Sequence, residues 1–187
     1  MKRPLLYSAL AAGLLGFSMT ASANFSGYYA PANWQVGNTL DDSGIVETTG
    51  APGAITLIGS NSGSGLASRV DFSIMAQAAG TFSFNWAYYS TDIEGAFWDP
   101  AGYFKNGQFQ LTDNLGTNSQ SGLVSLSVAA GDVIGFHVTT LDNLGGSASL
   151  GISNFSAPVP EPTSVAMMAL GLLGLVGVAS ARRRRLP

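Results

Sequence analysis

The fold class follows from one alternating stretch, Gly80-Thr81-Phe82-Ser83-Phe84-Asn85-Trp86-Ala87-Tyr88-Tyr89-Ser90. Four large aromatic residues occupy every second position in it, and small or polar residues lie between them. Successive side chains of a β-strand point to opposite faces, so this period of two predicts a strand with one buried aromatic face. A sheet packed on one side against a core is therefore expected.

Other runs along the chain have the same period. Short strands are also expected at Ile45-Val46 and at residues 55–58, and Asn106-Gly107 is typical of a tight hairpin turn with both residues at positive φ. Clusters of Gly, Asn, Asp and Ser separate the runs. Together they predict an all-β, antiparallel, jelly-roll-like sandwich over residues 24–157. The remaining alternating runs are Val70, Phe72 and Ile74; Val124, Leu126 and Val128; Ile134, Phe136 and Val138; and Ala148, Leu150 and Ile152.

Composition narrows the classes of function. Residues 24–157 are long enough for one domain with its own core. The chain has no cysteine, which excludes disulfides, zinc–thiolate sites and thiol catalysis. This segment holds two basic and ten acidic residues, a net charge of −8 against −3 for the whole chain. Such a surface repels phosphate backbones, so nucleic acid is not an expected partner.

The N-terminal segment has the three parts of a signal peptide. Lys2 and Arg3 form a basic start, residues 5–17 are apolar, and Ala21-Ser22-Ala23 has the small-x-small form that signal peptidase cleaves. We expect residues 1–23 to be removed, leaving Asn24 as the new N-terminus. An uncleaved membrane anchor is the alternative.

The C-terminal segment has the pattern of a membrane anchor. Residues 165–181 carry no charge and would span about 26 Å as a helix, near the short end for a bilayer core of roughly 30 Å. With the residues before it, the run predicts a transmembrane helix over 163–181. The four arginines that follow are costly to translocate and should stay in the cytoplasm; they are Arg182, Arg183, Arg184 and Arg185. A buried core helix with a basic end is the alternative.

Pro160-Glu161-Pro162 precedes the apolar run. Each proline fixes its own φ and disfavours helix in the residue before it, so the segment should be extended and solvated. A protease could bind such a segment without unfolding it. An ordinary proline-rich linker is the other interpretation.

The triplet, the apolar run and the arginine cluster together resemble the PEP-CTERM sorting signal. The resemblance covers only the C-terminal segment, assigned here as residues 158–187. It implies that Pro160, Glu161 and Pro162 are recognised by an exosortase, an integral-membrane enzyme that cleaves the anchor. It also implies export, first as a precursor in the inner membrane facing the periplasm, then to the cell surface or the extracellular polysaccharide matrix.

The segment 24–157 as a whole is similar to a recurrent group of proteins that carry this signal. The similarity lies in residues 82–86, residues 97–103, the Asn106-Gly107 turn, residues 130–136 and residues 152–162. It implies the same sandwich and no particular activity.

Candidate catalytic residues are few. His137 is the only histidine and lies opposite in phase to Phe136 and Val138, so a structural or exposed role is expected. Asp92, Glu94 and Asp99 are the acidic residues that could act as paired carboxylates in a glycoside hydrolase. Aspartates in turns more commonly bond to their own backbone, and we favour that role here. No catalytic residue is therefore assigned, and a polysaccharide-active hydrolase is the alternative function.

Two binding hypotheses remain for the sandwich. Calcium, which takes six to eight oxygen ligands, is a candidate at Asp92, Glu94 and Asp99, although no EF-hand spacing is present. Exposed aromatic rings could stack on sugars, and Trp98 and Tyr103 are the main candidates among Tyr28, Tyr29, Trp34, Tyr89, Trp98 and Tyr103. The sequence thus predicts a non-catalytic surface protein without a required cofactor. Its expected partners are signal peptidase, membrane lipid, an exosortase and matrix polysaccharide, and its expected role is structural, adhesive or glycan-binding.

Overall fold

The computed structural model describes residues 21–39, 44–160 and 170–174. Residues Ser22–Pro160 form one compact unit, which extends slightly beyond the predicted boundaries at 24 and 157. Of the terminal segments, only Ala21 and residues 170–174 are described, and the latter are helical. Within the described ranges, no helix has both the length and the apolar character needed to cross a bilayer.

The first layer of the compact unit is a six-stranded sheet with the hydrogen-bonded order β3-β4-β11-β6-β9, in which β1 also pairs with β11. β6 is the alternating stretch at residues 80–90, confirmed as a strand. It pairs antiparallel with β11 on one side and with β9 on the other. The strands are β1 (Ala21–Ala23), β3 (Ile45–Glu47), β4 (Ala54–Ile58), β6 (Gly80–Ser90), β9 (Ser119–Val128) and β11 (Ala148–Val159).

The second layer is a five-stranded antiparallel sheet with the order β2-β5-β10-β7-β8. Two short 3-10 turns, η2 (Gly27–Tyr29) and η3 (Pro31–Asn33), precede its first strand. The strands are β2 (Gln35–Thr39), β5 (Ser68–Met75), β7 (Ala101–Lys105), β8 (Gln108–Gln110) and β10 (Val133–Thr140).

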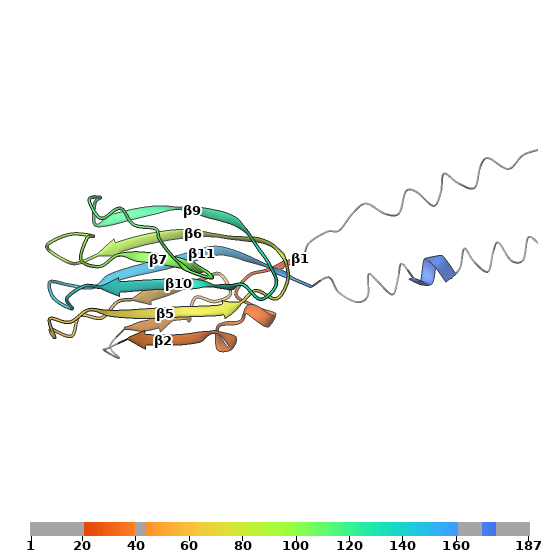
Figure 1. The fold of residues 1–187 in the computed structure, drawn as a ribbon, viewed down its shortest axis with the longest axis horizontal. Helices are drawn as coiled ribbons and strands as arrows, with labels where there is room; N and C mark the ends of the chain where they lie inside the picture. The colour runs from red at the N-terminus through yellow and green to blue at the C-terminus, as the bar shows by residue number, and fades with distance from the viewer. Residues whose placement is uncertain (1–20, 40–43, 161–169, 175–187) are drawn as a thin grey trace, which may run out of the picture. The chain divides into compact units, whose positions relative to one another are not determined.

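The chain crosses repeatedly between the two sheets. β4, β6, β9 and β11 belong to the six-stranded sheet, whereas β5, β7, β8 and β10 belong to the other. Figure 1 shows the long strands of both sheets running along a common direction. The predicted all-β antiparallel sandwich is confirmed, and the finer jelly-roll-like description stays a prediction.

Aromatic rings fill the space between the sheets. Phe84 of β6 lies edge-on to Phe136 of β10, with ring centroids 4.9 Å apart. Phe155 of β11 stacks on Phe25 at 4.3 Å and meets Trp34 edge-on at 5.6 Å. Aromatic pairs add about 0.5–1.5 kcal/mol each beyond their buried area. The core therefore holds both layers and the N-terminal turns together.

The predicted hairpin is present, but its turn differs from the expected form. Phe104 and Gln108 are the last register partners of the hairpin, so three residues lie between them, although Lys105 still belongs to β7 through its pairing with β10. Asn106 has a φ of 55°, whereas Gly107 is not at positive φ. A two-residue turn requires positive φ at both central positions, and a three-residue loop needs it only at one. The extra residue therefore accounts for the difference.

Candidate functional site

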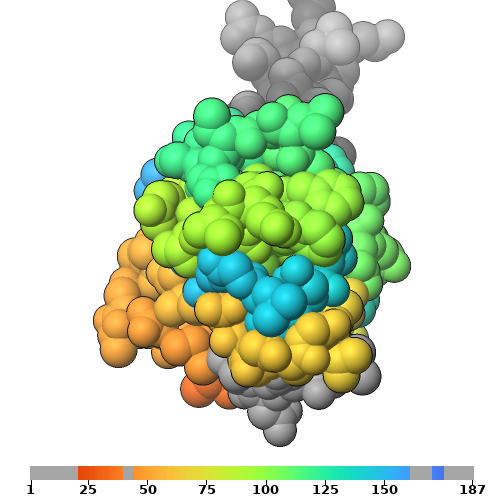
Figure 2. Space-filling view, turned by 90° about the vertical axis from the view of Figure 1, so that its left-hand side faces the viewer, coloured from red at the N-terminus to blue at the C-terminus, as the bar shows by residue number. Residues whose placement is uncertain are grey.

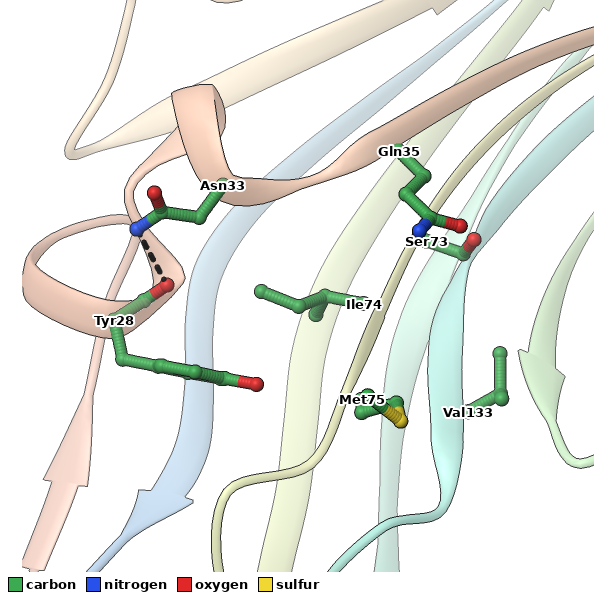
Figure 3. Close-up of a pocket in the computed structure, with 7 residues that line it drawn as sticks. All are labelled: Tyr28, Asn33, Gln35, Ser73, Ile74, Met75 and Val133. Atoms are coloured by element: carbon green, nitrogen blue, oxygen red, sulfur yellow. Dashed lines mark hydrogen bonds between the residues drawn. The ribbon is translucent and has the colours of Figure 1, made fainter.

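A pocket of about 280 Å³ lies on the outer face of the five-stranded sheet, close to η2 and η3. Figure 3 shows the phenol of Tyr28 extending from η2 toward the strands, while Gln35 points down beside Ser73. Gln35 and Ser73 are register partners across β2 and β5. The lining residues are Tyr28, Asn33, Gln35, Ser73, Ile74, Met75 and Val133.

The two turns that carry Tyr28 are anchored to the core through the neighbouring residue, Tyr29. Its side chain is fully buried, and its hydroxyl donates to the carbonyl of Pro158 at 2.7 Å and accepts from the N–H of Gln77 at 2.9 Å. Asn33 donates to the Tyr28 carbonyl at 3.0 Å, drawn as a dashed line in Figure 3. Because Tyr29 points inward, Tyr28 is left at the surface with 36% of its area exposed.

This pocket is uncharged, and its surface is more apolar than polar. None of its seven lining residues is ionised at neutral pH, although the surrounding segment carries a net charge of −8. The Asn33 amide nitrogen already donates to the carbonyls of Gly27 and Tyr28, so Asn33 offers only its amide oxygen as an acceptor. Gln35 offers a donor and an acceptor, Ser73 and Tyr28 offer hydroxyls, and Met75 supplies exposed apolar surface. An aromatic ring beside a few convergent polar groups is the usual composition of a small-molecule pocket.

Four side chains form a second feature on the same sheet face, called here the His137 cluster: Arg69, Asp71, Phe104 and His137. Asp71 lies two residues from Ser73 along β5, so the pocket and the cluster share one face. Arg69 Nε lies 2.7 Å from Asp71 Oδ1, and the Arg69 guanidinium lies 5.8 Å from the centre of the Phe104 ring. The rings of Phe104 and His137 are 5.1 Å apart.

His137 points outward, as its phase predicts, yet is only 7% exposed. Neither of its ring nitrogens hydrogen-bonds to a described residue. Burial lowers the pKa of His137 to about 4, and the positive charge of Arg69 acts in the same direction. The imidazole is therefore neutral at physiological pH, with one donor and one acceptor that have no partner among the described residues.

The predicted acidic residues lie at the loop end of the sandwich. Figure 2 shows the loop of residues 141–147 (cyan) between the loop of residues 91–100 (lime) and that of residues 59–67 (yellow). Asp92 Oδ1 accepts the backbone N–H of Glu94 at 2.6 Å, and Asp99 Oδ2 accepts from the Ser90 hydroxyl at 3.2 Å. Asp92 and Asp99 are buried, whereas Glu94 is exposed. Asp92 therefore acts as a turn residue, the role favoured from the sequence.

Asp99 is a buried carboxyl group with a raised pKa at this end. Burial raises the pKa of Asp99 to about 6, and the negative charge of Asp92 adds to the effect. No three acidic or histidine side chains in the described part of the chain are placed to hold a metal ion. The predicted calcium ligands Asp92, Glu94 and Asp99 do not form such a group, so a calcium ion there would need amide or backbone oxygens as further ligands, and the site stays a prediction.

The aromatic candidates are dispersed. Trp98 is half-buried and meets Phe97 edge-on at 5.4 Å. Tyr103 lies opposite Phe136 on the inner face of its sheet and stacks with Phe109 at 5.1 Å. Tyr29 and Trp34 are in the core, and Tyr89 is exposed on the outer face of the other sheet. Only Tyr28 of the six lines the pocket.

Sequence reasoning missed the polar residues of the pocket: Asn33, Gln35 and Ser73. None of them belongs to a motif, and Gln35 and Ser73 are 38 positions apart in the chain. They meet because β2 pairs with β5, a contact that alternation alone cannot assign. No local signal would have found them.

The residues predicted for cleavage and sorting are only partly described. Ala21 and Ala23 lie in β1, and the Ser156 hydroxyl donates to that of Ser22 at 2.9 Å. Cleavage after Ala23 would remove this short strand. Pro160 is exposed directly after β11. Outside the described residues lie Glu161, Pro162, the arginines at 182–185 and most of the predicted membrane helix.

A comparison with family models assigns the C-terminal segment. The model of the PEP-CTERM protein-sorting motif matches residues 158–185. The chain carries this PEP-CTERM motif. The match confirms the resemblance noted from the sequence, and the motif indicates an exported, membrane-anchored precursor that is processed to the cell surface.

Comparisons with whole proteins are less informative. No curated protein matches the chain. A family 35 carbohydrate-binding module from Clostridium thermocellum is 13% identical, with 65% of this chain and 92% of that one covered and a TM-score of 0.34. A module named CBM35 from Paenibacillus barcinonensis is 16% identical, with 64% and 97% covered and a TM-score of 0.32.

The enzymatically active domain of tailspike protein 4 from bacteriophage CBA120 is 14% identical. The match covers 68% of this chain and 20% of the phage protein, with a TM-score of 0.37. All three scores are below 0.5, so these similarities establish neither a shared fold nor a shared ligand.

Proposed function

We propose that this chain is an exported, non-catalytic protein of the cell surface or the exopolysaccharide matrix, sorted by an exosortase through its PEP-CTERM motif. Its compact unit serves a structural or adhesive role there and binds neutral glycan in the pocket beside Tyr28. The single observation that carries the sorting role is the match of the motif at residues 158–185.

The position of the motif relative to the fold supports recognition of the intact domain. β11 ends at Val159, and Pro160, the first residue of the triplet, is exposed. The protease therefore needs to bind only chain that follows the last strand. No hydrogen bond of the two sheets has to break before cleavage.

The sorting proposal is tested by Glu161→Ala, expressed in a bacterium that has an exosortase. We expect the uncleaved precursor to accumulate in the membrane fraction, because the only carboxylate between the two prolines is lost. The matched control is Glu47→Ala, which removes an exposed carboxylate from β3. Normal processing of Glu161→Ala, seen by immunoblot of membrane and surface fractions, would contradict recognition of the triplet.

The glycan proposal is supported by the contrast between the pocket and its surroundings. The pocket is uncharged in a domain of net charge −8, a surface that repels anionic polymers. Tyr28 offers a ring face to a sugar, and Asn33, Gln35 and Ser73 offer hydrogen bonds to hydroxyl groups. A neutral hexose polymer therefore fits better than a uronic acid polymer.

The glycan proposal is tested with the polypeptide of residues 22–160, which forms a compact unit with its own core. A glycan array identifies a neutral oligosaccharide, and titration calorimetry then measures its dissociation constant. Tyr28→Ala and Gln35→Ala should each weaken binding about tenfold, equivalent to about 1.4 kcal/mol.

Tyr89→Ala is the matched control for loss of a tyrosine, because Tyr89 is 57% exposed on the outer face of the six-stranded sheet. Equal weakening by Tyr89→Ala, or no binding to any neutral glycan on the array, would contradict this assignment of the pocket.

A further inference from the structure

One strand edge of the sandwich lacks the usual protection. β9 is ten residues long, pairs only with β6, and lies at the margin of its sheet in Figure 1. The other sheet edges are shorter: β2 has five residues, and β3 and β8 have three each. β3 also carries the charged residue Glu47. In the described part of the chain, the backbone of β9 bonds to no main-chain group other than those of β6, and the Thr117 hydroxyl donates to the Ser119 carbonyl at 2.7 Å.

The sequence of β9 contains neither a charged residue nor a proline. Natural edge strands are commonly protected by lysine, proline, bulges or short length, because their free N–H and C=O groups attract another strand. The outer edge of β9 therefore presents the N–H and C=O groups of every second residue of this strand without the usual protection. It does so within a domain of net charge −8, where an uncharged contact avoids the strongest repulsion.

The order of the outward-facing residues along β9 is the same from either end of the strand. Moving outward from Leu123, the next positions on this face are Ser121 and Ser125, followed by Ser119 and Ser127. Two such strands paired antiparallel about Leu123 place serine opposite serine at every mirrored outward position. A two-fold interface requires this kind of self-complementarity, in which the same patch contacts itself.

We propose that a second copy of this chain pairs with β9 through its own β9, antiparallel about a two-fold axis at Leu123. Ser121 then lies opposite Ser125 of the partner subunit, and Leu123 lies opposite the partner subunit's Leu123. The two six-stranded sheets join into one continuous sheet across the axis. Such a dimer can form whether or not the pocket binds glycan or the chain is sorted.

The surroundings of Leu123 favour contact with a second leucine. Its side chain is 69% exposed and borders a shallow depression of about 500 Å³ on the outer sheet face. Ala87, Trp86 and Gly122 also line this depression. Two leucines at the axis therefore bury apolar surface that a single copy leaves in water, and cross-strand pairs of this kind stabilise antiparallel sheets.

Sedimentation of the 22–160 polypeptide over a range of concentrations tests the proposal. We expect a reversible monomer–dimer equilibrium for the wild type. Leu123→Lys should raise the dissociation constant at least tenfold, because two like charges meet at the axis. Leu123→Glu should do the same, and an equimolar mixture of the two variants should recover the dimer as a heterodimer. Unchanged circular dichroism spectra would show that both variants fold.

Leu115→Lys is the matched control, since Leu115 is 94% exposed in the loop before β9 and should leave the dimer intact. Hydrogen exchange locates the contact independently: amides of β9 should gain protection as concentration rises, and those of β3 should not. A wild-type monomer at all concentrations, a dimer insensitive to Leu123→Lys, or protection confined to another element would overturn the proposal.

Discussion

The imidazole of His137 occupies an outward position in β10 and is nevertheless shielded from water by side chains of neighbouring strands. Its pKa of about 4 lies below the ordinary value of 6.5 because burial disfavours the charged form. Asp99 has the opposite shift for the same physical reason, with a pKa of about 6 instead of 3.8. The two groups therefore affect stability in opposite directions across the acidic range.

Whether each group makes stability rise or fall with pH depends on whether the folded or the unfolded chain binds the proton. Between pH 4 and 6.5 the unfolded chain protonates His137 and the folded chain does not, so this group makes stability rise with pH. Between pH 3.8 and 6 the folded chain holds a proton on Asp99 that the unfolded chain releases, so stability falls with pH. Each shift corresponds to about 3 kcal/mol, and the two contributions largely offset each other.

Removing either group should therefore reveal the other. As the pH rises from 4 to 6, the free energy of unfolding of His137→Leu should decrease, whereas that of the wild type should change little, because only the Asp99 contribution remains in the variant. That of Asp99→Asn should rise over the same range. Urea unfolding of the 22–160 polypeptide at half-unit pH intervals measures both slopes, with Asp113→Asn as the exposed control. Parallel curves for all four proteins would contradict the assigned shifts.

At the scale of single residues, the sequence predicted which face of the sheet His137 occupies but not that its side chain is buried. Alternation correctly placed His137 on the opposite face from Phe136 and Val138. Phe104 of β7 lies 5.1 Å from the imidazole, and the register partner of His137 on β5 is Asp71. A local pattern does not encode pairing partners that are so distant in sequence. The sequence therefore could not decide whether His137 is structural or exposed.

At the scale of elements, period-two alternation located the long strands β5, β6, β9, β10 and β11. Each buries one face against the same aromatic core, and this one-sided burial is what alternation records. η2 and η3 were not predicted, because three-residue turns have no period. Buried Tyr29 and Trp34 hold them, with the Trp34 indole donating to the Tyr29 carbonyl at 2.9 Å. The pocket was missed for this reason, since two of its lining residues come from these turns.

The free edge of β9 is also an element-scale property. The sequence predicted a strand around Val124, Leu126 and Val128, but the position of a strand within its sheet follows only from the pairing order. The dimerisation proposed above therefore depends on topology, whereas the palindromic serine pattern that supports it is visible in the sequence.

At the scale of the whole molecule, the sorting motif and the candidate binding pocket are encoded differently in the sequence. Sorting depends on a short contiguous motif, so the amino-acid sequence alone is enough to recognise residues 158–185. The proposed glycan pocket is formed by side chains gathered from η2, η3, β2, β5 and β10, so it could not be predicted. The concentration of basic residues at the ends and of acidic residues between them favours a location of the folded unit outside the cytoplasm.

The intact mass of the protein recovered from the cell surface tests the central claim most directly, because one spectrum defines both ends of the chain. We predict a species that begins at Asn24 and ends within or beside residues 160–162, without the apolar run and the four arginines. A full-length species from Met1 to Pro187, found in the cytosol and absent from the surface, would contradict export, exosortase cleavage and the proposed function together.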